Sequence, residues 1–222
     1  MTIHFQNEIE KLKKKILHVA AIVEGNLQKA VRSITDNSLQ LANEVIDSDL
    51  VVDSLEVEVE EECLKILALH QPVAADLRYI IAVLKINNDL ERIADLAVNI
   101  AERAETLACH STIPVPFNLP GMLDMTVKMV RDSVDALVSC DIHRARQVCS
   151  DDDEIDDHHK NAFKTIQEQI QLNPDFTEYF VSLLSVSRNL ERIADHATNI
   201  AEDIIYMIEG EIVRHQGKST DA

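Results

Sequence analysis

The sequence contains no tryptophan, four glycines and five prolines in 222 residues, and 4% of its residues are aromatic. Sheets with many tight turns use glycine and proline often, and their strands are rich in aromatic and β-branched residues. The composition therefore disfavours an all-β fold. Long helices need few of these residues, so we expect an all-α protein.

Two further absences restrict the function. No apolar run approaches the roughly 20 residues that a membrane-spanning helix requires. Basic residues are also few, because 21 Lys and Arg stand against 39 Asp and Glu, which gives a formal net charge of −18. Nucleic acid and anionic lipid are repelled by such a surface. We expect no nucleic acid and no direct membrane insertion, and we expect cations or basic protein surfaces as partners.

The four cysteines, Cys63, Cys109, Cys140 and Cys149, show no Cys-x-x-Cys spacing. The first residues also lack the apolar stretch of a secretory signal. These two features predict a protein of the reducing cytoplasm. Any association with a membrane is then expected to pass through another protein.

An internal repeat organises the chain. Residues 90–95 and 190–195 share the sequence Leu-Glu-Arg-Ile-Ala-Asp, and residues 99–102 and 199–202 both read Asn-Ile-Ala-Glu. Identity at one fixed offset indicates a duplication, which divides the chain into two halves of about 100 residues each. On a helix, the repeated block has an apolar face and an acidic ridge.

Apolar residues recur at intervals of three and four positions along most of the chain, which predicts three helices in each half. The expected helices cover residues 5–35, 39–70, 73–105, 122–138, 142–172 and 176–209. The residues at 36–38 supply N-cap chemistry, and the prolines at 72 and 174 mark helix ends.

The predicted architecture is two tandem homologous three-helix bundles, six long helices in all. The first bundle takes residues 1–110 and the second takes residues 122–210. Between them, residues 111–121 form a linker with three prolines and a glycine, a composition that interrupts helices. Residues 211–222 form a polar tail.

Pairs of acidic residues, one helical turn apart, recur on the second and third helix of each half. The eight acids are Asp49, Asp53, Glu91, Asp95, Asp152, Asp156, Glu191 and Asp195. Like charges one turn apart weaken a helix unless a cation or basic partner offsets them. Antiparallel helices about 8–10 Å apart can bring four carboxylates to one cation or a small group of cations. An all-oxygen site of this kind suits hard ions such as Mg, Ca, Mn or Fe.

Several alternatives remain open for these acids. They fit a solvated acidic surface, a contact for basic proteins, or general acid and base chemistry. His158 and His159 are candidate nitrogen ligands, whereas His196 is expected at the surface. Arg78, Arg92 and Arg192 are expected to pair with neighbouring acids.

Two other classes of protein compete with a binding role. A di-metal carboxylate enzyme in a helical bundle uses Glu-x-x-His from two helices, and the sequence contains no Glu-x-x-His. The acids also lie on the polar edge of their helices, so they are expected to face outward. A metal-buffering scaffold is the second alternative.

These features resemble the PhoU family, the accessory regulators of phosphate uptake. The resemblance rests on the duplicated blocks, on Gln-Pro-Val-Ala-Ala-Asp-Leu-Arg at 71–78, and on the paired acids. It implies that the eight acids correspond to the family's multinuclear clusters of divalent or trivalent metal, with Fe, Mn, Mg or Zn as candidates. Residues 174–179 differ in sequence from residues 71–78, so Asp76 and Arg78 lack matching residues in the second half.

The resemblance also implies a function. The expected role is non-enzymatic negative regulation of phosphate-starvation signalling, in which the protein links the phosphate ABC transporter to a sensor histidine kinase. A homodimer is expected, in the cytoplasm, with recruitment to the inner face of the membrane by these partners.

Overall fold

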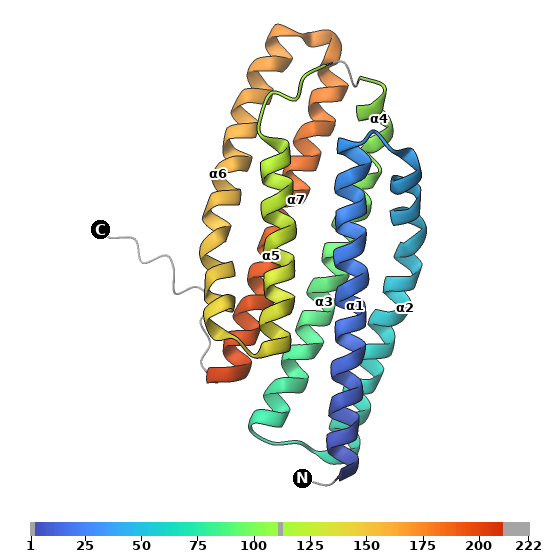
Figure 1. The fold of residues 1–222 in the computed structure, drawn as a ribbon, viewed down its shortest axis with the longest axis vertical. Helices are drawn as coiled ribbons and strands as arrows, with labels where there is room; N and C mark the ends of the chain where they lie inside the picture. Colours follow the sequence, from blue (N-terminus) through green and yellow to red (C-terminus); the bar gives the residue numbers. More distant parts are fainter. Residues whose placement is uncertain (1–2, 111–112, 211–222) are drawn as a thin grey trace, which may run out of the picture.

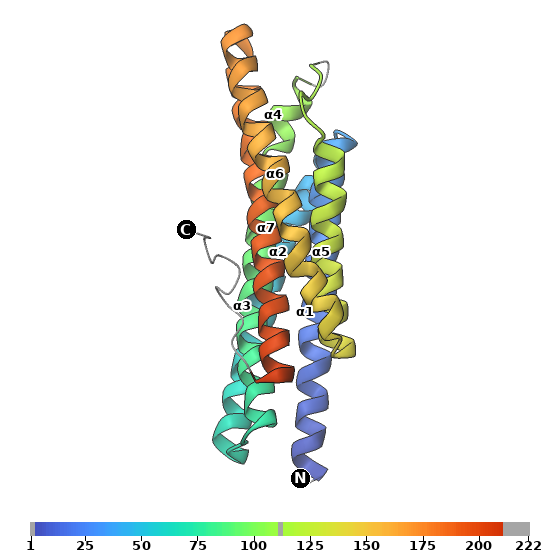
Figure 2. The same ribbon diagram turned by 90° about the vertical axis from the view of Figure 1, so that its left-hand side faces the viewer.

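The computed structural model describes residues 3–110 and 113–210, and these ranges contain helices and no strands. The six long helices are α1 (Ile3–Thr35), α2 (Leu39–His70), α3 (Ala75–Ala101), α5 (Leu119–Ser139), α6 (Ile142–Leu172) and α7 (Thr177–Glu209). Two short elements accompany them, α4 (Ala104–Ala108) and the 3-10 turn η1 (Pro174–Phe176). The helices run along the long axis of an elongated molecule (Figures 1 and 2).

The helices form two three-helix bundles side by side (Figure 1). Helices α1, α2 and α3 pack together in the first bundle, and α5, α6 and α7 pack together in the second. The bundles meet mainly where α3 packs against α7, and α1 also contacts α5. Because α3 and α7 run in opposite directions, the two acidic ridges of the repeat are antiparallel. The predicted fold class is therefore confirmed.

Local chemistry explains where helices α2 and α6 begin and where α7 ends. Ser38 caps α2, because its hydroxyl accepts a hydrogen bond from the amide of Leu41 at 3.4 Å. Asp141 caps α6 in the same way and accepts from the amides of His143 and Arg144 at 3.0 and 3.1 Å. Gly210 ends α7 with φ +76°, a left-handed conformation that glycine adopts without strain.

The apolar faces predicted from the repeat form the core. Each core position of the repeated block is at most 2% exposed in both copies; the paired positions are Leu90 and Leu190, Ile93 and Ile193, Ala94 and Ala194, Ala97 and Ala197, and Ile100 and Ile200. Burial of equivalent residues at the same depth lets both halves hold their acidic ridges in the same way.

Helix ends differ in places from the prediction. The predicted third helix, 73–105, begins at Ala75 and ends at Ala101, and the separate helix α4 follows it. Helix α5 begins three residues earlier than expected, because Asn118 caps it through the amide of Gly121 and Pro120 fits its first turn. The predicted polar tail lies outside the described residues.

The seam between α3 and α7 contains polar contacts that no local sequence pattern predicts. Asp89 accepts a hydrogen bond from His196 at 2.8 Å, and Lys85 forms a 3.0 Å ion pair with Asp203, whose side chain is 2% exposed. The prediction that His196 is a surface residue is therefore wrong: its side chain is 19% exposed and faces the other bundle. Arg78 was expected to pair with an acid, but its Nε donates to the carbonyl of Met207 at 3.4 Å.

None of the helices in the described residues is both long enough and apolar enough to cross a bilayer.

Candidate functional site

The first acidic cluster consists of Asp49 and Asp53 on α2 and Glu91 and Asp95 on α3. Burial raises the pKa of Asp49, and the negative charges of Asp53 and Asp95 raise it further. Burial also raises the pKa of Glu91, with the charges of Asp95 and Asp53 acting in the same direction. These mutual effects mean that carboxylates of α2 and α3 lie close enough for their charges to repel one another.

Two oxygens of the first cluster are buried without a hydrogen bond among the described residues, Asp49 Oδ1 and Glu91 Oε2. Arg92 offers the only ion pairs that the described residues make with this cluster: its Nε lies 3.1 Å from Glu91 Oε2 and its Nη1 lies 2.8 Å from Asp95 Oδ2. Arg92 therefore pairs with neighbouring acids as predicted. Glu91 Oε2 thus has a positive charge beside it, whereas no ion pair among the described residues reaches Asp49 Oδ1. A buried carboxylate oxygen without a donor is costly, so the cluster retains a capacity for positive charge at Asp49.

The second acidic cluster consists of Asp152 and Asp156 on α6 and Glu191 and Asp195 on α7. Burial raises the pKa of Asp152 to about 6, and the charges of Asp195 and Asp156 add to the shift. Burial and these two neighbours also raise the pKa of Glu191. The cluster thus repeats the first one at the equivalent place in the second bundle.

The clusters are more enclosed than the sequence suggested. Glu91 is 18% exposed, whereas Asp95 and Asp156 are 37% and 40% exposed. Part of each ridge therefore lies in the groove between two helices. This partial burial explains why desolvation is the largest cause of the raised pKa at Asp49, Glu91, Asp152 and Glu191.

The arrangement fits a hard cation in charge and donor type, because each cluster offers carboxylate oxygens, and in the first cluster Asp49 Oδ1 is buried without a hydrogen bond among the described residues. The side chains are not closed around a common point: within residues 3–110 and 113–210, no group of three or more His, Cys, Asp and Glu side chains is arranged to hold a metal ion. Binding would therefore require rotation of these carboxylates toward one another.

The two candidate nitrogen ligands are directed elsewhere. His159 Nδ1 lies 2.9 Å from the hydroxyl of Ser187, and burial lowers the pKa of this imidazole. His158 lines a shallow depression beside Asp153 and Asp157, which do not belong to the second cluster. The negative charge of Asp156 acts on the pKa of His159 in the opposite direction to burial, so this imidazole lies near the second cluster. Its Nδ1 contacts Ser187, however, and no hydrogen bond or ion pair among the described residues joins either histidine to the four acids.

The raised pKa of Asp152 gives a direct test of repulsion in the second cluster. In metal-free protein at pH 7.5, Asp152→Asn is expected to raise the free energy of unfolding by about 1 kcal/mol, which allows for solvent screening of a partly exposed group. Since the pKa is raised from 3.8 to about 6 in the folded state, stability should also fall as pH rises through this window, and the variant should lose this component. Urea unfolding with chelator present measures both effects.

The matched control for this test is Asp157→Asn on the same helix. Asp157 is 75% exposed and lies 3.3 Å from Lys160, so its replacement should change stability by less than about 0.5 kcal/mol. A loss of stability in metal-free Asp152→Asn would contradict the view that the ionised cluster repels itself.

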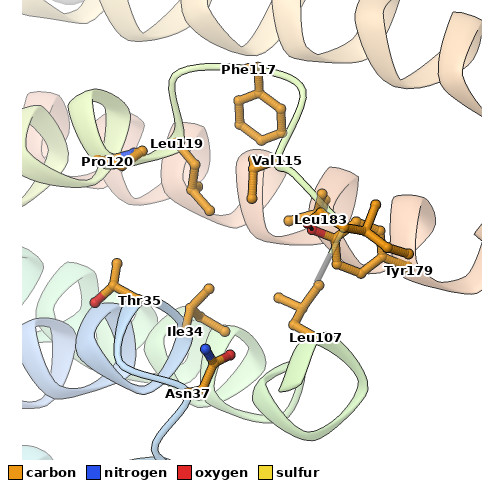
Figure 3. Close-up of a pocket in the computed structure, with 11 residues that line it drawn as sticks. Ile34, Thr35, Asn37, Leu107, Val115, Phe117, Leu119, Pro120, Tyr179 and Leu183 are labelled. Carbon is orange, nitrogen blue, oxygen red and sulfur yellow. Dashed lines mark hydrogen bonds between the residues drawn. The ribbon is translucent and has the colours of Figure 1, made fainter. Parts of the chain in front are cut away.

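No sequence pattern indicates a pocket, yet the structure contains an apolar cavity of about 420 Å³ away from the acids. It lies where the end of α1, α4, the loop before α5 and the start of α7 meet (Figure 3). Ile34, Leu107, Val115 and Leu183 line it, and the hydroxyl of Tyr179 at its edge donates to the carbonyl of Ile113 at 2.9 Å. Four segments distant in the sequence form this cavity, so no local pattern could have predicted it.

Comparison with known proteins agrees with the duplicated architecture. The family model described as "PhoU domain" matches residues 16–104 and again residues 119–204. The PhoU homologue 1 of Thermotoga maritima, named a phosphate-specific transport system accessory protein, is 35% identical over 94% of this chain and 90% of its own length. A homologue with the same description from Aquifex aeolicus is 38% identical over 94% of this chain and 95% of its own length.

Solved structures give the same result. The crystal structure of PhoU from Pseudomonas aeruginosa superposes with a TM-score of 0.89 at 33% identity, and the match covers 93% of this chain and all of the other. The phosphate transport system regulatory protein PhoU from Streptococcus pneumoniae has a TM-score of 0.80 at 25% identity. With two matched domains and relatives more than 30% identical along almost their whole length, the chain belongs to the PhoU family.

Proposed function

We propose that this protein is a non-enzymatic accessory protein of phosphate uptake. In this proposal it restrains phosphate-starvation signalling when phosphate is plentiful, by linking the phosphate ABC transporter to a sensor histidine kinase in the cytoplasm. The observation that carries the proposal is the match of both halves to the PhoU domain, with relatives of similar length named as phosphate transport accessory proteins. The homodimer implied by the resemblance is part of the same proposal.

The acidic surface supports a role in protein contacts. The formal net charge is −18, and the two clusters place eight acids on the helices of both bundles. Such a surface favours basic protein surfaces and cations over nucleic acid or anionic lipid. Two packed bundles of long helices also offer rigid faces to more than one partner at a time.

We further propose that both clusters bind metal, as a multinuclear group of divalent or trivalent ions drawn from Fe, Mn, Mg or Zn. The support is the repulsion among the acids of each cluster and the buried Asp49 Oδ1, which lacks a hydrogen bond among the described residues. A bound cation would supply positive charge there. The acids would hold the ion, and Arg92 would position Glu91 and Asp95 from beside it.

The regulatory proposal is tested in a strain that lacks this protein. In phosphate-rich medium we expect a phosphate-starvation reporter to be switched on and phosphate uptake to become unrestrained, and we expect the wild-type chain to restore repression. Association is measured in parallel by cross-linking the tagged protein to the transporter and kinase. An unchanged reporter together with no cross-linked transporter component would contradict the proposal.

The contribution of the clusters is tested by replacing all eight acids with Asn or Gln in the same strain. Loss of repression with a folded variant would place the clusters in the regulatory surface. Turnover of a substrate that disappears with these substitutions would instead support a di-metal enzyme, and normal repression would leave the clusters outside regulation.

A further inference from the structure

Helix α2 has two apolar faces, and one of them is covered. Its buried face follows a seven-residue spacing through Val45, Val52, Val59 and Ile66. A second row of apolar residues is exposed to between 38% and 77%, and we call it the α2 stripe: Leu39, Ile46, Leu50, Val57 and Leu64. The stripe also follows spacings of four and seven, which are typical of a helix that pairs with another helix.

The α2 stripe lies along one side of the helix and faces away from its own bundle. At about 100° per residue its five side chains fall within an arc of about 40°, roughly 150° around the helix from the buried row. With a rise of about 1.5 Å per residue, the stripe is about 38 Å long. Helix α2 packs against α1 and α3 and lies at the outer edge of the molecule (Figure 1). An exposed apolar row of this length is uncommon on a protein without a partner.

The second bundle shows that the fold does not need this stripe. Helix α6 occupies the place of α2, and its acid pair Asp152 and Asp156 aligns with Asp49 and Asp53. In this alignment the stripe positions 50, 57 and 64 correspond to Asp153, Lys160 and Gln167. The first two stripe positions correspond to Ile142 and Cys149, which pack against the core. The two copies of one helix therefore differ on this face, so the stripe is not a requirement of the shared fold.

Charge around the α2 stripe indicates what could cover it. Asp53 and Glu60 border it on one side, Asp47 and Glu61 border it on the other, and all four are exposed. None of the four forms a salt bridge with the described residues. The one Lys or Arg of α2 is Lys65, which already pairs with Glu62 at 3.1 Å. The stripe is thus an apolar row between two acidic borders.

We propose that the α2 stripe binds an amphipathic helix of a partner protein, whose apolar face is bordered by Lys and Arg. Apolar side chains at heptad spacing would meet the stripe, and basic residues would face the four acids, as in paired helices whose border charges select the partner. A second copy of this chain fits less well, because two α2 faces brought together would oppose acids with acids.

This inference deepens the proposed accessory role by naming a docking face and the chemistry of its partner. The docking face and the accessory role can be disproved separately, because the docking test uses purified protein and a peptide, without transport components and with chelator present. A negative result would remove the docking face and leave the accessory role to the experiments described above.

The test uses the full chain and a labelled synthetic helix of about four heptads, with leucines on one face and Lys or Arg on both borders. A second peptide of the same composition has its leucines scattered around the helix, and a third carries Glu borders. We expect fluorescence anisotropy to show binding of the first peptide at least about tenfold tighter than either of the others.

The decisive variant is Leu50→Asp with Leu64→Gln. It interrupts the stripe with the residues that α6 carries at the same positions, so the fold is known to accommodate them, and it adds negative charge. We expect it to bind the first peptide at least about tenfold more weakly, despite stronger long-range attraction. The control is Leu172→Gln, at a side chain that is 72% exposed at the end of α6, and it should bind as the wild type does.

Three results would overturn the proposal. The first is equal binding of the first peptide by the wild type and the stripe variant. The second is equal binding of the scattered-leucine peptide, which would mean attraction by net charge alone. The third combines two observations: the wild type sediments as a dimer whereas the stripe variant is a monomer, and the wild type does not prefer the first peptide. This result would assign the stripe to contact with a second copy of the chain. Circular dichroism checks that each variant remains helical.

Discussion

Leu90→Ala and Leu190→Ala are each expected to lower the free energy of unfolding by about 2–5 kcal/mol. Both leucines are fully buried, and each precedes a glutamate of an acidic cluster, Glu91 or Glu191. Truncation removes apolar contacts and leaves a cavity that the packed helices can fill only in part. Because the residues occupy the same place in the repeat, the two losses should be of similar size.

Urea unfolding followed by circular dichroism measures these losses, with chelator present so that metal does not contribute. The matched control is Leu172→Ala, whose side chain is 72% exposed and whose truncation should change stability by less than about 0.5 kcal/mol. A loss below about 1 kcal/mol at either buried leucine would mean that the repeated apolar faces do not form the core as described.

Metal binding is expected to have an effect of similar size. For protein first stripped with chelator, Mn²⁺ at a hundred times its dissociation constant should raise the free energy of unfolding by about 2.7 kcal/mol for one site. The physical reason is that the cation relieves repulsion between acids of two helices, such as Asp49 and Asp95, and gives the buried Asp49 Oδ1 a positive partner. For a chain of this length, the midpoint of thermal unfolding should rise by about 5–11 °C.

The control for this effect is the variant with all eight acids changed to Asn or Gln. It should show no stabilisation by Mn²⁺, and without metal it should be at least as stable as the wild type, because the repulsion is gone. Equal midpoints for the wild type with and without metal would contradict the proposed binding. A loss of stability in the metal-free variant would contradict the proposed repulsion.

Much of the fold follows from the repeated block. Its apolar positions fix the buried faces of α3 and α7, and its acids fix the ridges beside those faces, so the two bundles and the acidic ridges on these helices could be predicted. The sequence pattern is local, however, and indicates only which face of a single helix is apolar and which is acidic. It does not state which helices of different bundles meet.

The features that could not be predicted all depend on contacts between distant segments. His196 has an exposed place on an isolated α7, and only the packing of α3 against it brings Asp89 within 2.8 Å. The apolar cavity beside Tyr179 needs four separate segments. The α2 stripe was missed for another reason: α2 has apolar residues on both faces, and the sequence does not indicate which of them the bundle buries.

We have proposed that each half of the duplicated chain holds metal through its own acidic cluster. Elemental analysis of protein purified without metal-chelating resin tests it most directly, with three variants beside the wild type. One has Asn or Gln at the four acids of the first cluster, one at those of the second, and one at all eight. We expect each single-cluster variant to keep the metal of its intact cluster and the eight-acid variant to keep none. Metal content equal in all four proteins, or absent from the wild type, would contradict it.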